Sequence, residues 1–385
     1  MANRNPIALA LLSVLALSLP VWASPTVPVL IVGASDLPEL TVLGARLSAV
    51  AQGSAHAGAT LPMSTPLTVR ATGHGLEVRR GDQPAQIVHR LTIAPQSNAL
   101  TLQWGTAHKA VAAPVTISLR KGRLWVVADI AEDTYLGGVL AGEITPSAPW
   151  EALKAQAIVA RSFLYQSRER HGVHQALVCD QSHCQRMVAA SAVALALRKA
   201  VSDTAGLVVT GAHDTPVPVY YHASCGGTTT AVRQVFGGPD WAHLRGVADP
   251  VCATEPGWTV SQPLGACLAA LTKSKLFVPA GATDFTVTDR SGTGWPITVS
   301  VAAPLPKQLD AYTVWLAFGA AWGWGKVPGL HYDLHREGDV VLITGRGLGH
   351  GIGLCQRGMM GRAAMGHKAA TILAHYFPGT RVHAR

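Results

Sequence analysis

The hydrophobic periodicity of the chain changes near residue 130, and this change constrains the fold more than any single motif. Between Val27 and Val127, short runs such as VPVLIVG, PLTVRAT and GRLWVVAD are separated by Gly, Pro, Ser and Asn. Such runs are typical of β-strands joined by turns. After Asp129, apolar residues recur at helical spacing. The sequence therefore predicts an α+β protein, with a small β-rich region at 24–121 and a region of mixed helices and antiparallel β-sheet at 122–385.

The first two predicted helices meet at a Pro-rich corner that contains one acidic residue. Asp133 or Thr134 is suited to cap a helix that ends at Gly142, because a side-chain oxygen satisfies free backbone N–H groups there. A second helix begins at the second Pro of the corner and covers 149–169. Glu143 lies at the corner itself. Further along, the same patterns predict a helix at 189–201, strands at 207–210 and 217–222, and a last helix at 369–376.

Glu143 has two interpretations. A carboxyl at a helix end beside apolar residues has a raised pKa when it is desolvated, as a general acid requires. Lys154 and Arg161 are seven residues apart and project from one side of the second helix. They are suited to hold Glu143 ionised or to bind a substrate's carboxylate and hydroxyls. From these residues alone, a structural pair between Glu143 and Arg161 is favoured.

The N-terminus has the features of a secretory signal peptide at 1–23. Arg4 precedes the apolar stretch IALALLSVLALSL, which is followed by Pro and Val-Trp-Ala. That stretch is shorter than the roughly 20 residues of a membrane span. We therefore expect an exported protein with no transmembrane segment after signal cleavage. The net charge of +9 suits an anionic surrounding such as a cell wall, while dispersed Lys and Arg argue against a nucleic-acid partner.

The stretch HGVHQALVCDQSHCQ combines thiols with imidazoles. Cys179, His183 and Cys184, with His174 or His171, offer the ligand types that zinc prefers. The spacing differs from the common zinc-finger patterns. Six cysteines in an exported chain also favour disulfides, so a Cys179–Cys184 disulfide or two unpaired thiols are the alternatives.

Two further stretches are rich in Gly. In YYHASCGGTTT, Ser224 or Cys225 lies near His222, but no third orienting residue is evident, so a catalytic triad is weakly supported. GRGLGHGIGLCQ follows a strand-like run, yet no acid follows it, which argues against a dinucleotide fingerprint. Alternating Gly residues instead let the backbone pass close to a ligand or another strand, with His350 and Gln356 exposed to it.

Four stretches between 122 and 380 form an ordered set of motifs: YLGGVLAGEI with WEALKAQAIVARSF, then CDQSHCQ, YHASCGGTTT and GRGLGHGIGLCQRGMMGRAAMGHKAATILAHYFPGT. Together they resemble the SpoIID/LytB family, which comprises stage II sporulation protein D and amidase-enhancer relatives. The resemblance implies a lytic transglycosylase. Such an enzyme cleaves the β-1,4 bond between N-acetylmuramic acid and N-acetylglucosamine in peptidoglycan strands stripped of stem peptides, and forms anhydro-muramic ends. It implies Glu143 as the catalytic acid and base, and as substrate-binding residues Lys154, Arg161, Tyr221, Ser224, His350 and Gln356.

The resemblance also carries expectations about metals and cysteines. It implies no cofactor for catalysis, and a structural zinc site at His174, Cys179, His183 and Cys184. It implies a Cys225–Cys252 disulfide, because some relatives have Cys at both places. Two departures from the family pattern are Cys355, where Ser is usual, and Arg186-Met187 after the CDQSHCQ stretch.

A single acid is consistent with the implied chemistry, because hydrolysis usually takes two carboxylates whereas a transglycosylase uses the sugar's own 6-hydroxyl. The runner-up is a non-catalytic wall-binding protein that enhances a cell-wall amidase, with Glu143 only gripping glycan. A weaker alternative is a zinc hydrolase at Cys179–Cys184. The expected location is the periplasm or the cell wall.

Overall fold

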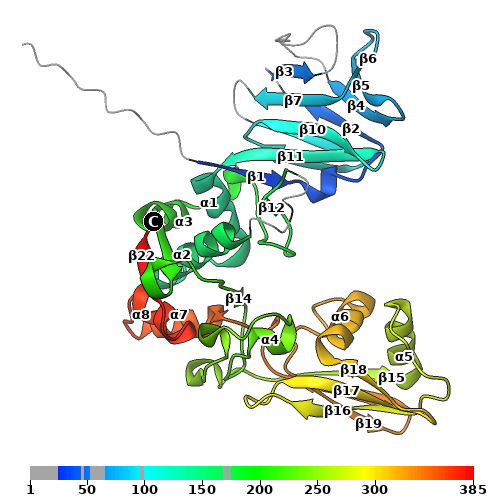
Figure 1. Ribbon diagram of the computed structural model, residues 1–385, viewed down its shortest axis with the longest axis vertical. Coiled ribbons are helices and arrows are strands. Elements are labelled where there is room, and N and C mark those ends of the chain that lie inside the picture. Colours follow the sequence, from blue (N-terminus) through cyan, green and yellow to red (C-terminus); the bar gives the residue numbers. More distant parts are fainter. Residues whose placement is uncertain (1–24, 45–46, 53–65, 96–98, 168–170, 172–174) are drawn as a thin grey trace, which may run out of the picture.

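The computed structural model describes residues 25–44, 47–52, 66–95, 99–167, 171 and 175–385. The predicted signal peptide and His174 lie outside these residues. A β region, a group of helices and a second sheet-containing body follow one another along the molecule, and the C-terminal segment returns to the helices (Figure 1). The predicted α+β class is confirmed. Among the described residues, no helix has the length and apolar character needed to cross a membrane.

The N-terminal β region consists of two six-stranded sheets. Its strands are β1 Thr26–Leu30, β2 Glu39–Leu43, β3 Leu47–Gln52, β4 Leu67–Thr72, β5 Gly75–Arg80, β6 Gln86–Val88, β7 Arg90–Pro95, β8 Leu100–Trp104, β9 Ala107–Val111, β10 Val115–Arg120, β11 Arg123–Ala131 and β12 Val178–Cys179, with a 3-10 turn η1 at Val32–Ala34. The strand orders are β12-β1-β11-β10-β7-β3 and β6-β5-β4-β2-β8-β9. Alternate residues such as Leu40, Val42 and Ile117 are buried, as expected for sheets that share a core.

The β region extends beyond the predicted boundary at residue 121. That boundary falls in the turn between β10 and β11, and β11 pairs with both β10 and β1. A later segment also joins this sheet, because β12 runs parallel to β1 with Leu30 opposite Cys179. Asp180 fixes the junction: its Oδ1 accepts a hydrogen bond from the Val32 N–H at 3.1 Å, and its other oxygen pairs with Lys109.

The helical part is built around one buried helix. Its elements are α1 Glu132–Glu143, α2 Trp150–Gln166, η3 Ala190–Ala192, α3 Leu195–Asp203, β13 Leu207–Thr210, η4 Ala212–Asp214, α7 Gln356–Ala364, α8 Ala369–Tyr376 and β22 Arg381–Ala384. α2 packs against α1, α3, α7 and α8, and almost every residue from Ala152 to Leu164 is buried. The predicted helices at 149–169 and 369–376 and the strand at 207–210 are confirmed. After α8 the chain adds β22, which pairs with β13.

Two local predictions in this part were wrong. α1 has no side-chain cap from Asp133 or Thr134, because β11 runs directly into the helix and its N-cap is Ala131. The helix predicted at 189–201 begins only at Leu195, after a separate short turn at 190–192.

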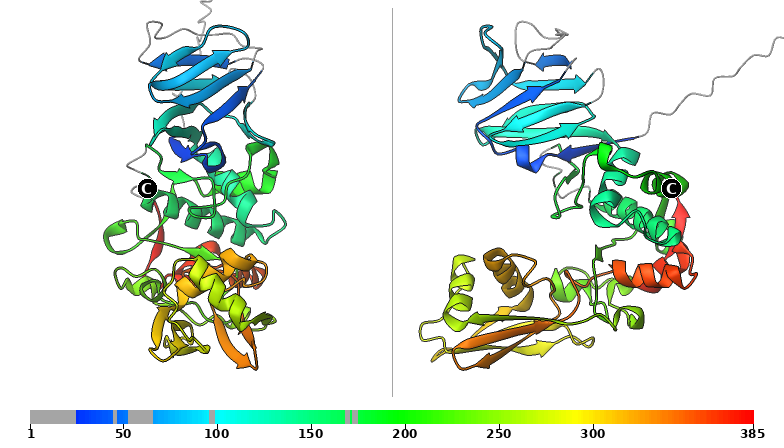
Figure 2. Two further views of the ribbon diagram at one scale, coloured as in Figure 1. Left: turned by 90° about the vertical axis from the view of Figure 1, so that its right-hand side faces the viewer. Right: turned by 180° about the vertical axis from the view of Figure 1, so that it is seen from behind.

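A second body holds most of the remaining chain. Its elements and connectors are β14 Tyr221–His222, α4 Val232–Val235, η5 Ala242–Leu244, η6 Pro250–Cys252, β15 Trp258–Pro263, α5 Leu264–Lys273, β16 Asp284–Arg290, β17 Pro296–Ala302, β18 Lys307–Asp310, α6 Ala311–Trp322, β19 Tyr332–Glu337, β20 Val340–Gly345 and β21 Leu354–Cys355. The sheets β15-β20-β19 and β16-β17-β18 carry α5 and α6 on one face (Figure 2). Trp315 and Phe318 of α6 are buried in the core of this body, whereas Trp324, just after the helix, is 49% exposed.

Candidate active site

The corner at Glu143 is shaped by the small residues of α1. Gly138 and Gly142 are four residues apart and lie on one face of the helix. A Cβ at Gly142 would lie 2.5 Å from the carbonyl oxygen of Arg186, and one at Gly138 would lie 2.7 Å from that of Val188. The Val188 N–H donates to the Gly138 carbonyl at 3.1 Å. The Gly face therefore lets the segment after the CDQSHCQ stretch pass directly over the end of α1.

Glu143 is half-buried at the end of that helix. Its Oε1 accepts a hydrogen bond from the Arg186 N–H at 3.1 Å, and its backbone oxygen accepts one from Gln356 Nε2 at 3.2 Å. Burial raises the pKa of the Glu143 carboxyl, while the Arg186 N–H and the nearby side chains of Gln356 and Tyr221 act in the opposite direction. The net upward shift favours a carboxyl that retains its proton, as a general acid does.

Tyr221 and Gln356 reach Glu143 from segments far apart in the sequence. β14 and β21 pair in parallel, with Tyr221 opposite Leu354. Gly353 makes this approach possible: its φ is +72°, and a Cβ there would lie 2.3 Å from the Tyr220 carbonyl oxygen. Burial and the neighbouring charge of Glu143 raise the pKa of Tyr221, so its hydroxyl keeps its proton. That buried hydroxyl has no hydrogen-bond partner among the described residues. The prediction that alternating Gly residues bring the backbone close to another strand is confirmed.

His350 lies beside this junction. Its Nδ1 accepts a hydrogen bond from the Ile352 N–H at 3.1 Å, and its ring packs near those of His222 and Phe236. Burial, together with the neighbouring His222, lowers the pKa of His350 to about 3. The ring is therefore neutral at neutral pH, and it is only half-buried.

Arg161 does not line a cleft. It has no exposed surface, and its Nε donates to Glu132 Oε1 at 3.1 Å. Its two terminal nitrogens donate to the carbonyl oxygens of Thr204 at 2.6 Å and Val201 at 3.0 Å. The predicted pair with Glu143 is therefore wrong, because Glu132 is the partner, and the fully buried side chain is not placed to contact a substrate. At the position of Arg161, the helix face that also carries Lys154 points into the protein interior.

The structure also locates the other two predicted binding residues, one on α2 and one just after β14. Lys154 pairs with Glu151 at 2.9 Å, and Glu151 also accepts from the N–H of Ala369 at the start of α8. Contact between Lys154 and substrate stays a prediction. Ser224 is fully buried and its hydroxyl contacts Glu255 and the Cys252 sulfur, so it is not placed to meet a ligand.

Sequence reasoning missed the contribution of the CDQSHCQ segment to the acid. Arg186 supplies both the N–H on the carboxyl and a nearby positive charge that lowers the pKa of Glu143. Gln185 is buried, and its Oε1 accepts from the Tyr135 hydroxyl at 3.2 Å. The only signal in the sequence was that Arg186 departs from the family pattern, which does not reveal a backbone contact.

The Cys/His stretch forms a compact cluster. The ligand atoms of His171, Cys179, His183 and Cys184 all lie within 4.8 Å of one another. Two thiols and two imidazoles in that volume fit a tetrahedral zinc ion. A hydrogen bond from Cys184, the largest cause, lowers the pKa of Cys179 to about 4, and the thiolate is the form that binds metal. Among the described residues His171 completes the set, whereas the predicted ligand His174 lies outside them, and no disulfide joins Cys179 to Cys184.

The predicted Cys225–Cys252 disulfide is also absent from the described part of the chain. Both residues are buried free thiols, and Cys355 lies with them. Cys355, at the position where the family usually has Ser, is a third thiol close enough to pair with either Cys225 or Cys252.

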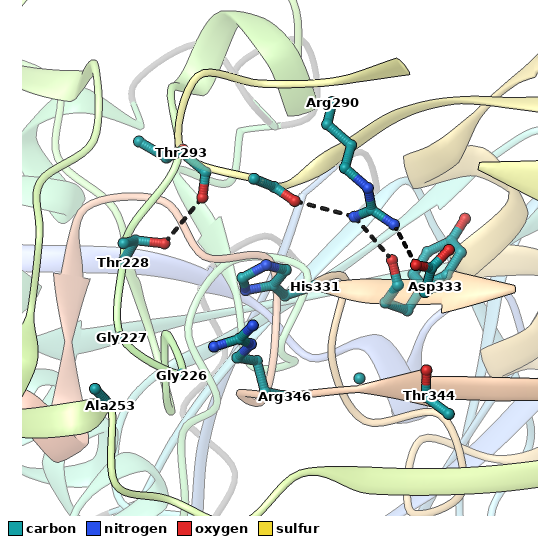
Figure 3. Close-up of a pocket in the computed structure, with 13 residues that line it drawn as sticks. Gly226, Gly227, Thr228, Ala253, Arg290, Thr293, His331, Asp333, Thr344 and Arg346 are labelled. Atoms are coloured by element: carbon teal, nitrogen blue, oxygen red, sulfur yellow. Dashed lines mark hydrogen bonds and ion pairs between the residues drawn. The ribbon is translucent and has the colours of Figure 1, made fainter. Parts of the chain in front are cut away.

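A separate cavity of about 630 Å³ lies behind the SCGG turn (Figure 3). Its lining includes Gly226, Gly227, His331 and Arg346, and Arg290 is held there by an ion pair with Asp333 at 2.9 Å. Glu143 is not part of its lining, so this cavity is distinct from the acid site.

Comparison with known proteins finds a family model and several relatives that are similar to this chain. Residues 120–210 match SpoIID, described as stage II sporulation protein. Stage II sporulation protein D of Bacillus subtilis is 24% identical over 286 residues, covering 70% of this chain and 80% of that protein. The Bacillus amyloliquefaciens protein of the same name is 25% identical, covering 70% and 79%. An uncharacterised protein of Brachyspira hyodysenteriae is 26% identical, covering 67% and 68%. The matched segment contains Glu143 and the Cys/His cluster, so the part of the chain that carries the candidate site is similar to the SpoIID family.

Proposed function

We propose that the protein is a peptidoglycan lytic transglycosylase with Glu143 as its general acid and base. Similarity to the SpoIID family model and to stage II sporulation protein D supports a peptidoglycan-related function. The observation that carries the finer proposal is a lone, partly buried carboxyl whose pKa is raised by burial. The substrate would be the β-1,4 bond between N-acetylmuramic acid and N-acetylglucosamine in stripped glycan strands, met in the periplasm or the cell wall.

The surroundings of Glu143 support a mechanism with one acid. In the described part of the chain, three other acidic residues that could act as a second carboxylate form ion pairs. Glu132 pairs with Arg161 at 3.1 Å, Glu151 with Lys154 at 2.9 Å and Asp240 with Arg245 at 2.8 Å. Asp133 lies at the opposite end of α1, about 15 Å from Glu143 at 1.5 Å per residue. A hydrolase of the usual kind would need a second carboxylate within about 10 Å on the other side of the sugar.

One carboxyl suffices when the substrate supplies the nucleophile. Glu143 protonates the glycosidic oxygen as the bond from C1 of the muramic residue to that oxygen breaks. The 6-hydroxyl of the same residue attacks C1, and the Glu143 carboxylate takes the hydroxyl proton. The carboxyl is thereby restored, and the product carries a 1,6-anhydro ring with no water consumed.

The neighbours of Glu143 have positioning roles in this scheme. The Arg186 N–H holds one carboxyl oxygen, which leaves the other available to the substrate. Gln356 fixes the backbone at the helix end, and Tyr221 adjusts the pKa of Glu143. A zinc ion held by His171, Cys179, His183 and Cys184 would fix the segment that ends at Arg186 and takes no part in the proton transfers.

The decisive test is the chemistry of the new chain ends. Purified mature protein is incubated with glycan strands stripped by an amidase, and the products are analysed by mass spectrometry. We expect anhydro-muramic ends from the wild type and none from Glu143→Gln. Reducing ends would indicate a hydrolase and contradict the proposal. No cleavage, together with faster turnover of an added cell-wall amidase, would favour the enhancer instead.

A further inference from the structure

The three cysteines that the active-site scheme leaves unused meet at one buried point. Cys225 follows β14, Cys252 ends η6 and Cys355 ends β21, and each is at most 1% exposed. The three sulfurs and a carboxylate oxygen of Asp249 all lie within 4.8 Å of one another. Three segments separated by up to 130 residues thus bring their ligand atoms into one small volume.

The spacing of the sulfurs fits ligands around a metal ion. The sulfurs of Cys252 and Cys355 are 3.7 Å apart. In a tetrahedral site with zinc–sulfur bonds of about 2.3 Å, neighbouring sulfurs lie about 3.8 Å apart. Three thiols also cannot all be satisfied by one disulfide, which would leave a reactive thiol buried beside it. A metal ion satisfies all three together.

Two backbone N–H groups point at the Cys355 sulfur. The sulfur accepts hydrogen bonds from the Cys225 N–H and the Gly358 N–H, each at 3.3 Å. The second of these caps α7, so the sulfur lies at the positive end of that helix, where a negatively charged ligand is stabilised.

The carboxylate of Asp249 is positioned as the fourth ligand by hydrogen bonds to both of its oxygens. It is fully buried, with one oxygen accepting from the Tyr376 hydroxyl at 2.6 Å and the other from Arg362 at 3.1 Å. Outer partners of this kind orient a ligating carboxylate. The Arg362 guanidinium also offsets the negative charge that three thiolates and a carboxylate bring into the core.

We propose that Cys225, Cys252, Cys355 and Asp249 form a second metal site, which binds a thiophilic divalent ion such as zinc. The ion would cross-link three segments: the SCGG turn, η6 and the start of α7. The residue after Cys355 is Gln356, whose side chain donates to the Glu143 backbone. The site therefore holds in place one of the residues that fix the catalytic corner, and it does so whether or not Glu143 cleaves glycan.

Metal content tests the proposal. Full-length mature protein is exported, purified without chelator, and its bound zinc is measured by mass spectrometry. We expect Cys355→Ser to contain one zinc ion per chain fewer than the wild type. Serine keeps an oxygen that accepts from the Gly358 N–H, so the helix cap is retained and circular dichroism should be unchanged. Cys267→Ser is the matched control, because Cys267 is buried without being part of either cluster.

A second measurement tests the proposal even if Cys355→Ser does not fold. In a Cys179→Ser/Cys184→Ser double variant, which lacks the sulfur ligands of the first cluster, added cobalt(II) should still give the intense thiolate-to-metal absorption. Loss of that band, or equal zinc in Cys355→Ser and wild type, would overturn the proposal. So would a Cys225–Cys252 disulfide found by peptide mapping of alkylated, unreduced protein.

Discussion

At the scale of single residues, the behaviour of Glu143 depends on opposing influences on one proton. Burial disfavours the carboxylate, and three neighbouring donor groups favour it. Each donor comes from a different segment, so the pKa of the acid reports whether the site is assembled. Substitutions of the donors should therefore shift the pH dependence before they abolish activity.

Tyr221→Phe should shift the alkaline limb of the pH–rate profile upward. The Tyr221 hydroxyl stabilises the ionised form of Glu143, so removing it raises the pKa of the acid further. A general acid is active while protonated, and its rate falls as the pH rises through its pKa. The variant should therefore keep its activity to higher pH, as measured by kcat/KM on stripped glycan across pH. An unchanged or lowered alkaline limb would contradict the role assigned to Tyr221.

Arg161 should matter for stability rather than for substrate binding. Arg161→Gln leaves Glu132 buried without its partner, and breaking such a pair costs about 3–5 kcal/mol. Urea unfolding followed by circular dichroism should show this loss, while KM for the folded fraction remains near the wild-type value. Arg70→Gln is the control, because its pair with Glu39 is exposed and water screens it. A raised KM with unchanged stability in Arg161→Gln would contradict this account and indicate that Arg161 binds substrate.

At the scale of elements, the Gly face of α1 decides how closely the Arg186 segment approaches the acid. Gly142→Ala should lower activity and stability, although Ala ordinarily favours a helix over Gly by about 1 kcal/mol. The added Cβ would lie 2.5 Å from the Arg186 carbonyl, so the segment must move away from Glu143. Gly265→Ala in α5 is the control, because nothing lies within 4 Å of its Cβ position. Equal activity in the two variants would contradict the account.

The elements that the sequence predicted well are those with strong local signals. α2 opens after Pro149 and carries apolar residues at helical spacing, and β13 is a short β-branched run. The start of α1 was missed because a strand running directly into a helix leaves no capping residue to read. The proposed catalytic acid, Glu143, could be identified from its resemblance to the family motifs. The orientation of Arg161 and the Arg186 N–H contact could not, because both depend on tertiary packing.

At the scale of the whole molecule, the Cys/His cluster links the β region to the helices. β12 contributes Cys179 to the cluster while pairing with β1, and Arg186 follows a few residues later at the end of α1. A metal ion bound at this cluster would thus couple the stability of the β region to the geometry around Glu143.

Zinc should therefore stabilise the protein through this first site. Zinc at 100 times its dissociation constant stabilises a folded state by about 2.7 kcal/mol relative to the metal-free protein. We expect chelation to lower the melting temperature of the wild type, and Cys184→Ser to lose most of that response. Cys267→Ser should respond like the wild type. A melting temperature that is equally sensitive to chelator in wild type and Cys184→Ser would contradict a stabilising metal at this cluster.

The most direct test of the central claim is the single-turnover rate of Glu143→Gln on stripped glycan strands. Gln keeps an oxygen that accepts from the Arg186 N–H but cannot exchange a proton. General acid–base catalysis contributes about 10²–10⁴-fold, so formation of anhydro-muramic ends should fall by at least that factor with glycan binding unchanged. Cleavage within a few-fold of the wild-type rate would contradict the assignment of Glu143 as the acid.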